Sequence, residues 1–361
     1  MEAISNIAAT LYCLGRQEEA EKHWVQAVKI RPSYLEAVEH LVGLLCSNHR
    51  SQQAVNMIEF VQHALRMPVS SASRDHASET GSEADTASTT TARELSPNSF
   101  ALDTDRNDSP ELRFSSAARG KQAHGGQGHD SQGQQQPGYG SSGYAIPGSE
   151  NGRMILLIHA KGNMLYALKD TDRASESFEE AVLISAGREV KGVQGLIWTI
   201  QSVLAPRDPR SGLPRRATQN LSAPLLLPPD KAKHTAQLVF SASHGQLPGL
   251  RCVPEGSHRK SAVSTTSNSL LSLAKIFQDS MSNGGPTSGL IRRPTGVGDI
   301  LALYYLSLSL QESPSTANNV GILLASVQQS SAQQVPNPQA IVPTTIPGIV
   351  PGSGLALALA Y

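Results

Sequence analysis

The feature that most constrains how this chain folds is an apolar pattern that recurs after 34 residues. The first copy contains two stripes at helical spacing, one made of Ile4, Ile7, Ala8 and Leu11 and the next of Ala20, Trp24 and Ala27. Apolar residues return 34 positions later at all of these places, namely Val38, Leu41, Val42, Leu45, Ala54, Ile58 and Val61. The recurrence predicts that residues 1–68 form two consecutive copies of one helix–turn–helix unit.

The residues around the stripes indicate how each unit turns and packs. Gly15 lies between the two stripes and tolerates the left-handed conformation in which helices often end. Pro32 follows the second stripe and prevents the helix from continuing. The alanines of the stripes let two helices approach closely, and the indole of Trp24 fills the space between them. We therefore expect two closely packed antiparallel helices in each copy.

A third copy begins near Met154, where helical periodicity returns. In this copy Phe178 takes the place of Trp24. Residues 151–204 are therefore expected to contain a third unit and, from about Val190, the first helix of a fourth. Across the three copies the predicted core residues are Ala8, Leu11, Ala20, Trp24, Ala27, Pro32, Ala54, Gly162, Ala174, Phe178 and Ala181.

Long stretches outside these units are too polar to fold on their own. Only 39% of the residues are hydrophobic and 4% are aromatic, while the chain contains 30 Gly and 22 Pro. Residues 69–150 are rich in Ser, Thr, Gly and Gln, and cannot bury enough apolar surface to offset the entropy of ordering. We expect this segment to be disordered.

After residue 204 the helical periodicity survives only in pieces. Residues 205–267 are expected to be mostly loop, with one helix at 231–242 and a second loop at 245–266. The helix at 231–242 is a candidate partner for the helix that begins near Val190.

Residues 268–329 read as degenerate repeat helices with a loop insertion. The second of them fits the repeat in two registers, on Ala302, Leu306 and Ser309 or on Leu301, Tyr305 and Leu308. A Pro-rich loop at 330–354 and the start of a truncated helix at 355–361 follow. Because a repeat array normally needs a polar capping helix at each end, we expect this chain to be a fragment of a longer protein.

A 34-residue helical hairpin with small, aromatic, small and proline positions in this order resembles the tetratricopeptide repeat (TPR) family. The resemblance implies an all-α fold in which TPR helix–turn–helix units stack into a superhelix, an α-solenoid, here interrupted by long disordered insertions. It also implies a protein-interaction scaffold. Protein or peptide segments are the expected partners, and self-association into a homo-oligomer is an open alternative.

The sequence contains no recognisable catalytic constellation. It lacks a Gly-rich phosphate loop, a C-x-x-C pair, an H-E-x-x-H and a G-x-S-x-G motif, so we expect no catalytic residue, metal site or cofactor. Thirty basic residues balance thirty acidic ones and no long apolar run occurs, so neither nucleic acid nor a membrane is an expected partner. Three scattered cysteines fit a reducing compartment, which makes the cytoplasm or nucleus the expected location.

Polar residues on the first helices are the candidate peptide-binding groups. Asn6 and Asn319 precede an apolar–small pair at equivalent places, and His40 takes that place in the second copy. An amide has donors and an acceptor, which suits contact with peptide groups of any sequence. The resemblance to TPR superhelices implies that the first helices line a concave surface, so we predict a peptide-binding surface there containing these three residues, although Ala160 and Ser272 interrupt it. Surface residues without a binding role are the alternative.

Two phrases, Leu14–Glu21 and Ala27–Pro32, resemble the repeats of O-linked N-acetylglucosamine transferases. Asparagine before an apolar–small pair is typical of those repeats, where asparagines hold the backbone of a bound peptide. The long insertions resemble a fungal form of this glycosyltransferase family. The resemblance implies a substrate-recruiting portion of a protein that transfers N-acetylglucosamine from its UDP conjugate to Ser or Thr, with the catalytic lobes absent from these residues. A stand-alone adaptor in a chaperone, cell-cycle or transcription complex is the alternative.

Overall fold

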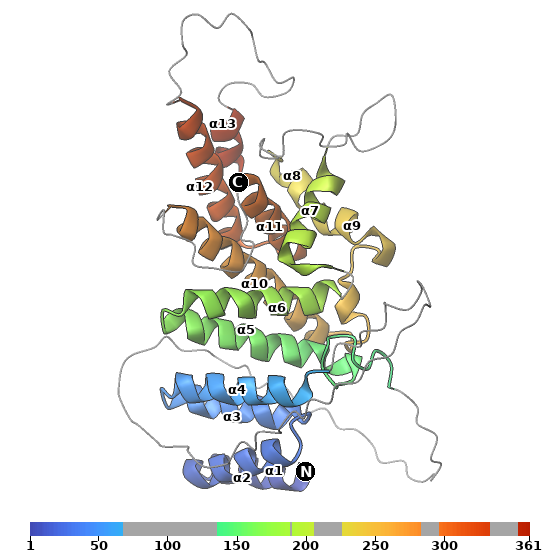
Figure 1. Cartoon of the computed structure of the whole chain (residues 1–361), viewed down its shortest axis with the longest axis vertical. Helices are drawn as coiled ribbons and strands as arrows, with labels where there is room; N and C mark the ends of the chain where they lie inside the picture. The colour runs from blue at the N-terminus through green and yellow to red at the C-terminus, as the bar shows by residue number, and fades with distance from the viewer. Residues whose placement is uncertain (68–135, 188–189, 206–225, 283–295, 333–352) are drawn as a thin grey trace, which may run out of the picture.

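In the computed structural model, residues 1–67, 136–187, 190–205, 226–282, 296–332 and 353–361 are described. These residues form helices and their connecting loops, and within them the one β-type pairing is an isolated bridge between Arg66 and Tyr144. The predicted all-α stack of helical hairpins is therefore confirmed (Figure 1). The predicted disorder falls largely on residues 68–135, and the Pro-rich loop on 333–352; both lie outside the described residues.

Three hairpins form the N-terminal part of the stack. They are α1 (Glu2–Cys13) with α2 (Gln17–Ile30), α3 (Leu35–Ser47) with α4 (Ser51–Leu65), and α5 (Asn151–Ala167) with α6 (Thr171–Ala186). Each hairpin packs on the next, since α2 contacts α3 and α4 contacts α5 (Figure 1). The third hairpin therefore follows the second directly in space, although residues 66–150 separate them in the sequence.

The turn inside the hairpin has the same geometry in all three copies. Its left-handed residue is Gly15 (φ 77°), His49 (φ 57°) or Lys169 (φ 67°). The following residue in each copy donates its backbone N–H to a leucine carbonyl in the preceding helix, at 2.8 to 2.9 Å. The role predicted for Gly15 is confirmed. The other two copies show that this backbone conformation is kept where no glycine is present.

Equivalent core positions on the two helices of each hairpin are buried. In the first and third hairpins a small residue on the first helix is matched by a large one on the second, Ala8 with Trp24 and Gly162 with Phe178, whereas the second hairpin has Val42 and Ile58. A Cβ atom on Gly162 would lie 2.7 Å from the Phe178 ring, so only glycine fits there. Of the predicted core, the residues that are buried are Ala8, Leu11, Ala20, Trp24, Ala27, Ala54, Gly162, Ala174, Phe178 and Ala181, and Pro32 is half-buried.

Four helices continue the stack toward the C-terminus. They are α10 (Ser257–Ser282), α11 (Val297–Leu310), α12 (Pro314–Ala332) and α13 (Ser353–Ala360). The first of them lies along both α5 and α6, and each later helix packs on the one before it (Figure 1). Pro314, which the sequence places after a repeat helix, is also the first residue of α12, a position that proline tolerates well.

Short elements form a layer beside this stack. They are η1 (Gly148–Glu150), α7 (Gly192–Leu204), α8 (Pro229–Ala232), α9 (Thr235–Val239), η2 (Ser241–Ser243) and η3 (Pro248–Leu250). The predicted helix at 231–242 is thus divided into shorter segments. As the sequence suggested, α7 contacts α9, but the pair lies against α11, and it is α10 that covers α5 and α6.

The structure differs from the predicted loop at 245–266, because α10 already begins at Ser257. The sequence is polar there, yet Ala262 and Thr266 are buried. Thr265 and Thr266 donate their hydroxyl groups to backbone carbonyls four residues earlier, at 2.9 and 2.8 Å. These bonds within the helix let a Ser/Thr-rich face be buried, which a hydrophobic pattern does not reveal.

The structure also differs from the prediction at the C-terminal end of the segment that was expected to be disordered. Residues 136–150 are folded against the third hairpin, and Tyr144 and Ile146 are 2% and 0% exposed. The backbone N–H of Ala145 donates to the carbonyl of Leu65 at 2.7 Å. Two buried apolar side chains and this backbone pairing order a stretch whose composition alone suggests disorder.

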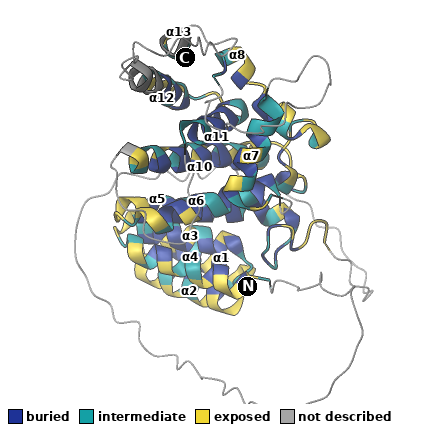
Figure 2. Ribbon diagram, turned by 45° about the horizontal axis from the view of Figure 1, so that its top comes forward, coloured by how far each residue is buried: buried dark blue, intermediate teal, exposed yellow. Residues whose placement is uncertain are grey.

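Packing on several sides explains why the register of α11 is ambiguous in the sequence. Residues from Ile300 to Leu308 are buried all around the helix, which is covered by α10, α12, α7 and α9 (Figure 2). Both predicted registers therefore fall on buried positions, except that Ser309 is half-buried. A helix enclosed on all sides has no single apolar stripe.

Candidate functional site

The structure separates the three predicted peptide-binding residues into two groups. Asn6 on α1 and His40 on α3 occupy equivalent places on adjacent hairpins, and both are exposed. Asn319 lies on α12 at the opposite end of the stack and is half-buried (Figure 1). Ala160, at the equivalent place of α5, is 6% exposed. Of the predicted peptide-binding surface, the part formed by Asn6 and His40 is therefore exposed to a partner on the first two hairpins.

An aromatic cluster formed by Tyr12, Trp24 and His40, which we call the first-hairpin cluster, adjoins this surface. The His40 ring stacks on the Trp24 indole with centroids 5.3 Å apart and planes inclined by 16°, and the Tyr12 ring lies 5.8 Å from the indole. Trp24 is 2% exposed while Tyr12 is 44% exposed. Burial lowers the pKa of His40, partly opposed by Glu36, so the ring is mainly neutral near pH 7.

The cluster can therefore offer flat, uncharged surfaces to a bound chain. The buried Nε1 of Trp24 has no hydrogen-bond partner among the described residues, so the indole retains an unused donor. Aromatic rings of this kind contact proline rings and peptide planes well. The sequence predicts a packing role for Trp24 and a surface position for His40. Their stacking depends on the contact between hairpins, which the pattern within each hairpin does not reveal.

Two polar clusters occur where the third hairpin meets its neighbours. Between α3 and α5, Glu39 pairs with Arg153 at 3.0 Å, and burial raises the pKa of Glu39 to about 7, with Arg153 opposing. Between α5 and α10, Nδ1 of His159 lies 2.9 Å from the Ser269 hydroxyl, and burial lowers the pKa of His159 to about 4. Both clusters join neighbouring helices, which indicates a structural role.

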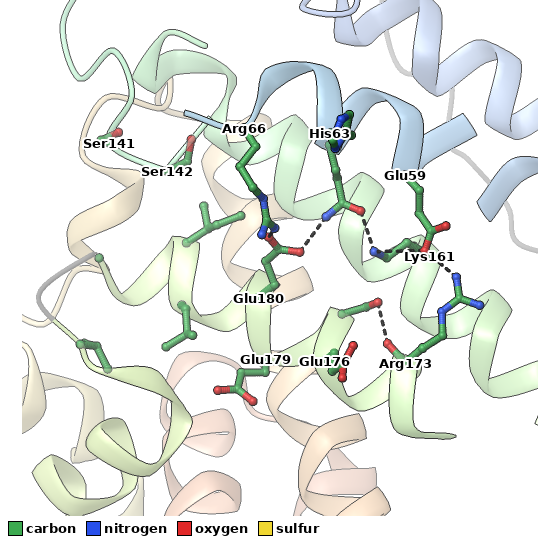
Figure 3. Close-up of a pocket in the computed structure, with 16 residues that line it drawn as sticks. Glu59, His63, Arg66, Ser141, Ser142, Lys161, Arg173, Glu176, Glu179 and Glu180 are labelled. Carbon is green, nitrogen blue, oxygen red and sulfur yellow. Dashed lines mark hydrogen bonds and ion pairs between the residues drawn. The ribbon is translucent and has the colours of Figure 1, made fainter. Parts of the chain in front are cut away.

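A cleft of about 700 Å³, which we call the α4–α6 cleft, opens between the second helices of the second and third hairpins (Figure 3). Glu180 of α6 accepts hydrogen bonds from Gln62 of α4 and from Arg66, the residue that follows α4, each at 2.7 Å, and from the Tyr144 hydroxyl. Lys161 of α5 donates to the Gln62 side-chain oxygen at 2.6 Å.

The charges at this wall of the cleft are satisfied within the protein. Lys161 is 9% exposed, and burial lowers its pKa, opposed by Glu180 and Glu59. Arg173 pairs with Glu59 at 2.6 Å. The sequence does not reveal this cleft, because its groups come from parts of the chain more than a hundred residues apart.

The described residues contain no group of three or more His, Cys, Asp or Glu that could hold a metal ion. None of their helices is both long and apolar enough to cross a membrane. The two surfaces described above offer hydrogen-bonding, stacking and ionic contacts.

Comparison with known proteins supports the repeat type of the first hairpin. Residues 1–31, which span the first hairpin, match a family model described as tetratricopeptide repeat. No curated protein and no solved structure matches the chain. Together with the stacked hairpins, the match supports a protein-interaction scaffold built on TPR units.

Proposed function

We propose that the first two hairpins bind an extended peptide segment of a partner protein, with Asn6, His40 and Tyr12 as contact residues. The observation that carries this proposal is the pair of exposed rings, Tyr12 and His40, that flank the buried Trp24. The TPR match over residues 1–31, which include Asn6 and Tyr12 but not His40, supports it, because such repeats generally bind protein segments.

The chemistry of the surface favours a segment that is extended and uncharged. A neutral His40 ring and the Tyr12 ring provide stacking surfaces, while the amide of Asn6 can both donate to and accept from a peptide backbone. A proline-containing segment satisfies these contacts at low entropic cost, because its extended conformation is already preferred in solution.

A peptide array enriched in proline and aromatic residues tests this proposal. Peptides selected on the wild-type protein are measured in solution by fluorescence anisotropy, with the wild type and with the double variant Tyr12→Ala/His40→Ala. We expect at least a tenfold loss of affinity, because exposed aromatic anchors commonly contribute more than about 1 kcal/mol each. Trp198→Ala is the matched control, since Trp198 is 63% exposed and lies on α7. Equal affinity for both proteins contradicts the proposal.

We further propose that the scaffold recruits substrates for an O-linked N-acetylglucosamine transferase-like activity. The support is the resemblance of the Leu14–Glu21 and Ala27–Pro32 phrases to the repeats of those enzymes. Sequencing the transcript beyond Tyr361 tests it. A reading frame that continues into alternating strands and helices supports the transferase, whereas an immediate stop codon favours the stand-alone adaptor.

A further inference from the structure

One face of α1 presents a row of exposed residues at an end of the stack, which we call the α1 stripe. The first hairpin forms this end of the described helices (Figure 1). The stripe consists of Ala3, Ile7, Thr10 and Leu14, which follow one another at intervals of four, three and four residues. All four are exposed, Ile7 by 49% and Leu14 by 67%. This alternation of intervals is the one by which two helices pack side by side with interlocking side chains.

The equivalent face of the second hairpin is buried. In α3, the residues 34 positions after Ala3, Ile7 and Thr10 are 0%, 0% and 3% exposed, namely Ala37, Leu41 and Leu44. The reason is that α3 packs on both α2 and α4, whereas α1 packs chiefly on α2. The face by which one hairpin receives a neighbouring helix is therefore open on α1.

The polar groups of the α1 stripe do not oppose an apolar contact. The Thr10 hydroxyl donates to the Asn6 carbonyl at 2.8 Å, so it is satisfied within α1 and leaves the methyl group for packing. The N–H of Leu14 donates to the Thr10 carbonyl at 3.0 Å, so Leu14 extends the helical spiral by one residue beyond Cys13. The stripe therefore offers apolar atoms along the whole of α1, a length of about 18 Å.

We propose that the chain forms a symmetric dimer in which the α1 stripes of two copies pack against each other in antiparallel orientation. A twofold axis between Ile7 and Thr10 places Ile7 against the partner's Thr10. The same axis places Leu14 against the partner's Ala3. Each larger side chain thus meets a smaller one, as the interlocking of antiparallel helices requires.

The charges at the two ends of α1 favour the antiparallel arrangement. Glu2 lies in the first turn and Arg16 follows the helix, so the same register brings Glu2 close to the partner's Arg16. Arg16 already pairs with Glu19 through Nε and Nη2, which leaves its Nη1 group without a partner among the described residues. A parallel pair would instead bring like charges together. Because the stripe complements itself in both size and charge, we identify a second copy of the chain as its occupant.

Sedimentation velocity of the full chain tests the dimer. One helix pair buries less than the standard interface of about 1,600 Å², so we expect a dissociation constant in the micromolar range. Measurements from about 1 to 200 µM protein cover this range. Ile7→Glu should weaken the dimer at least about tenfold, because it buries two carboxylates in an apolar contact. Ile322→Glu is the matched control, since Ile322 is 52% exposed on α12.

A monomer at every concentration overturns the proposal and leaves the α1 stripe to a helix of another protein. An equal loss of self-association in Ile7→Glu and Ile322→Glu also overturns it. If Ile7→Glu folds poorly, Leu14→Glu replaces it, because Leu14 is 67% exposed and should have the same effect on the dimer. Tyr12→Ala/His40→Ala should leave the dimer unchanged, since neither residue belongs to the stripe. Failure of the dimer is therefore distinguishable from failure of the proposed peptide site.

Disulfide cross-linking tests the antiparallel register. In Ala3→Cys/Leu14→Cys the two new thiols of one chain lie about 16 Å apart along α1, too far for a disulfide within the chain. Oxidation with copper phenanthroline should therefore join them across the dimer, and non-reducing electrophoresis detects the product. The wild type, with its exposed Cys13, and Ile322→Cys give the background. A covalent dimer no more abundant than this background overturns the proposed packing.

Discussion

Arg66 and Tyr144 pair as an isolated antiparallel bridge. The segment that follows the second hairpin therefore lies beside the segment that precedes the third. Both side chains also reach Glu180 of α6, the Arg66 guanidinium at 2.7 Å. The bridge therefore fastens the two ends of the long insertion to the third hairpin. This arrangement explains how α4 and α5 can stack as neighbours although the insertion separates them in the sequence.

Removing the Tyr144 hydroxyl should loosen this junction. Tyr144→Phe keeps the buried ring but leaves Glu180 without one donor, so we expect the free energy of unfolding to fall by about 1–2 kcal/mol. Chemical denaturation followed by circular dichroism measures the change. Tyr139→Phe is the control, because Tyr139 is 49% exposed in the same segment. Equal stability of the two variants argues against a structural role for the Glu180 network.

The two tryptophans allow a direct test of the hairpin core. Trp24 is 2% exposed and Trp198 is 63% exposed. Trp24→Ala should leave a large cavity and cost about 3–5 kcal/mol, whereas Trp198→Ala should change stability by about 0.5 kcal/mol or less. Urea denaturation of both variants measures the difference. A small effect of Trp24→Ala contradicts its place between packed helices.

The first three hairpins could be predicted because their information is local. The apolar spacing within each helix and the order of the two stripes are enough to place Trp24 and Phe178 at equivalent positions. The same reasoning places Asn6 and His40 on equivalent first helices. Periodicity is sufficient where each unit packs through one apolar stripe.

The later helices and the α4–α6 cleft depend on contacts between distant parts of the sequence, which periodicity does not reveal. Thr266 is buried as a polar residue, so the start of α10 looks like a loop in the sequence. In the Glu180 network, Gln62 and Glu180 are 118 positions apart in the sequence, and Tyr144 comes from a third segment that lies between them. Such contacts follow from how hairpins stack across an insertion, and the sequence of each segment alone carries no signal for them.

Gly162 should be intolerant of even the smallest side chain. A Cβ atom would lie 2.7 to 2.9 Å from three carbons of the Phe178 ring, so the helices must separate or the ring must move. We expect Gly162→Ala to cost about 1–3 kcal/mol, despite the higher helix propensity of alanine. Thermal unfolding measures the loss. Gly162→Ala combined with Phe178→Leu should be less destabilised than the sum of the single variants, because the smaller side chain makes room.

His159 should make stability depend on pH in the acidic range. Its pKa is lowered by burial from 6.5 to about 4, so the unfolded chain binds a proton more readily than the folded one. The neutral ring therefore contributes fully to stability above about pH 6.5, and its contribution is lost progressively as pH falls toward 4. By linkage the loss reaches about 3 kcal/mol near pH 4.

His159→Gln isolates this contribution, because the amide does not titrate but can still bond to Ser269 and Asn163. The test compares urea midpoints of the wild type and the variant from pH 7.5 to 4. Glu39, whose pKa is raised to about 7, acts in the opposite direction, since its protonation stabilises the folded state as pH falls. That effect is common to both proteins and cancels in the comparison. The wild type should lose stability faster than the variant below pH 6.5, because His159 binds a proton in the unfolded chain but stays neutral in the folded one. Parallel curves of the urea midpoint against pH contradict a buried neutral imidazole between α5 and α10.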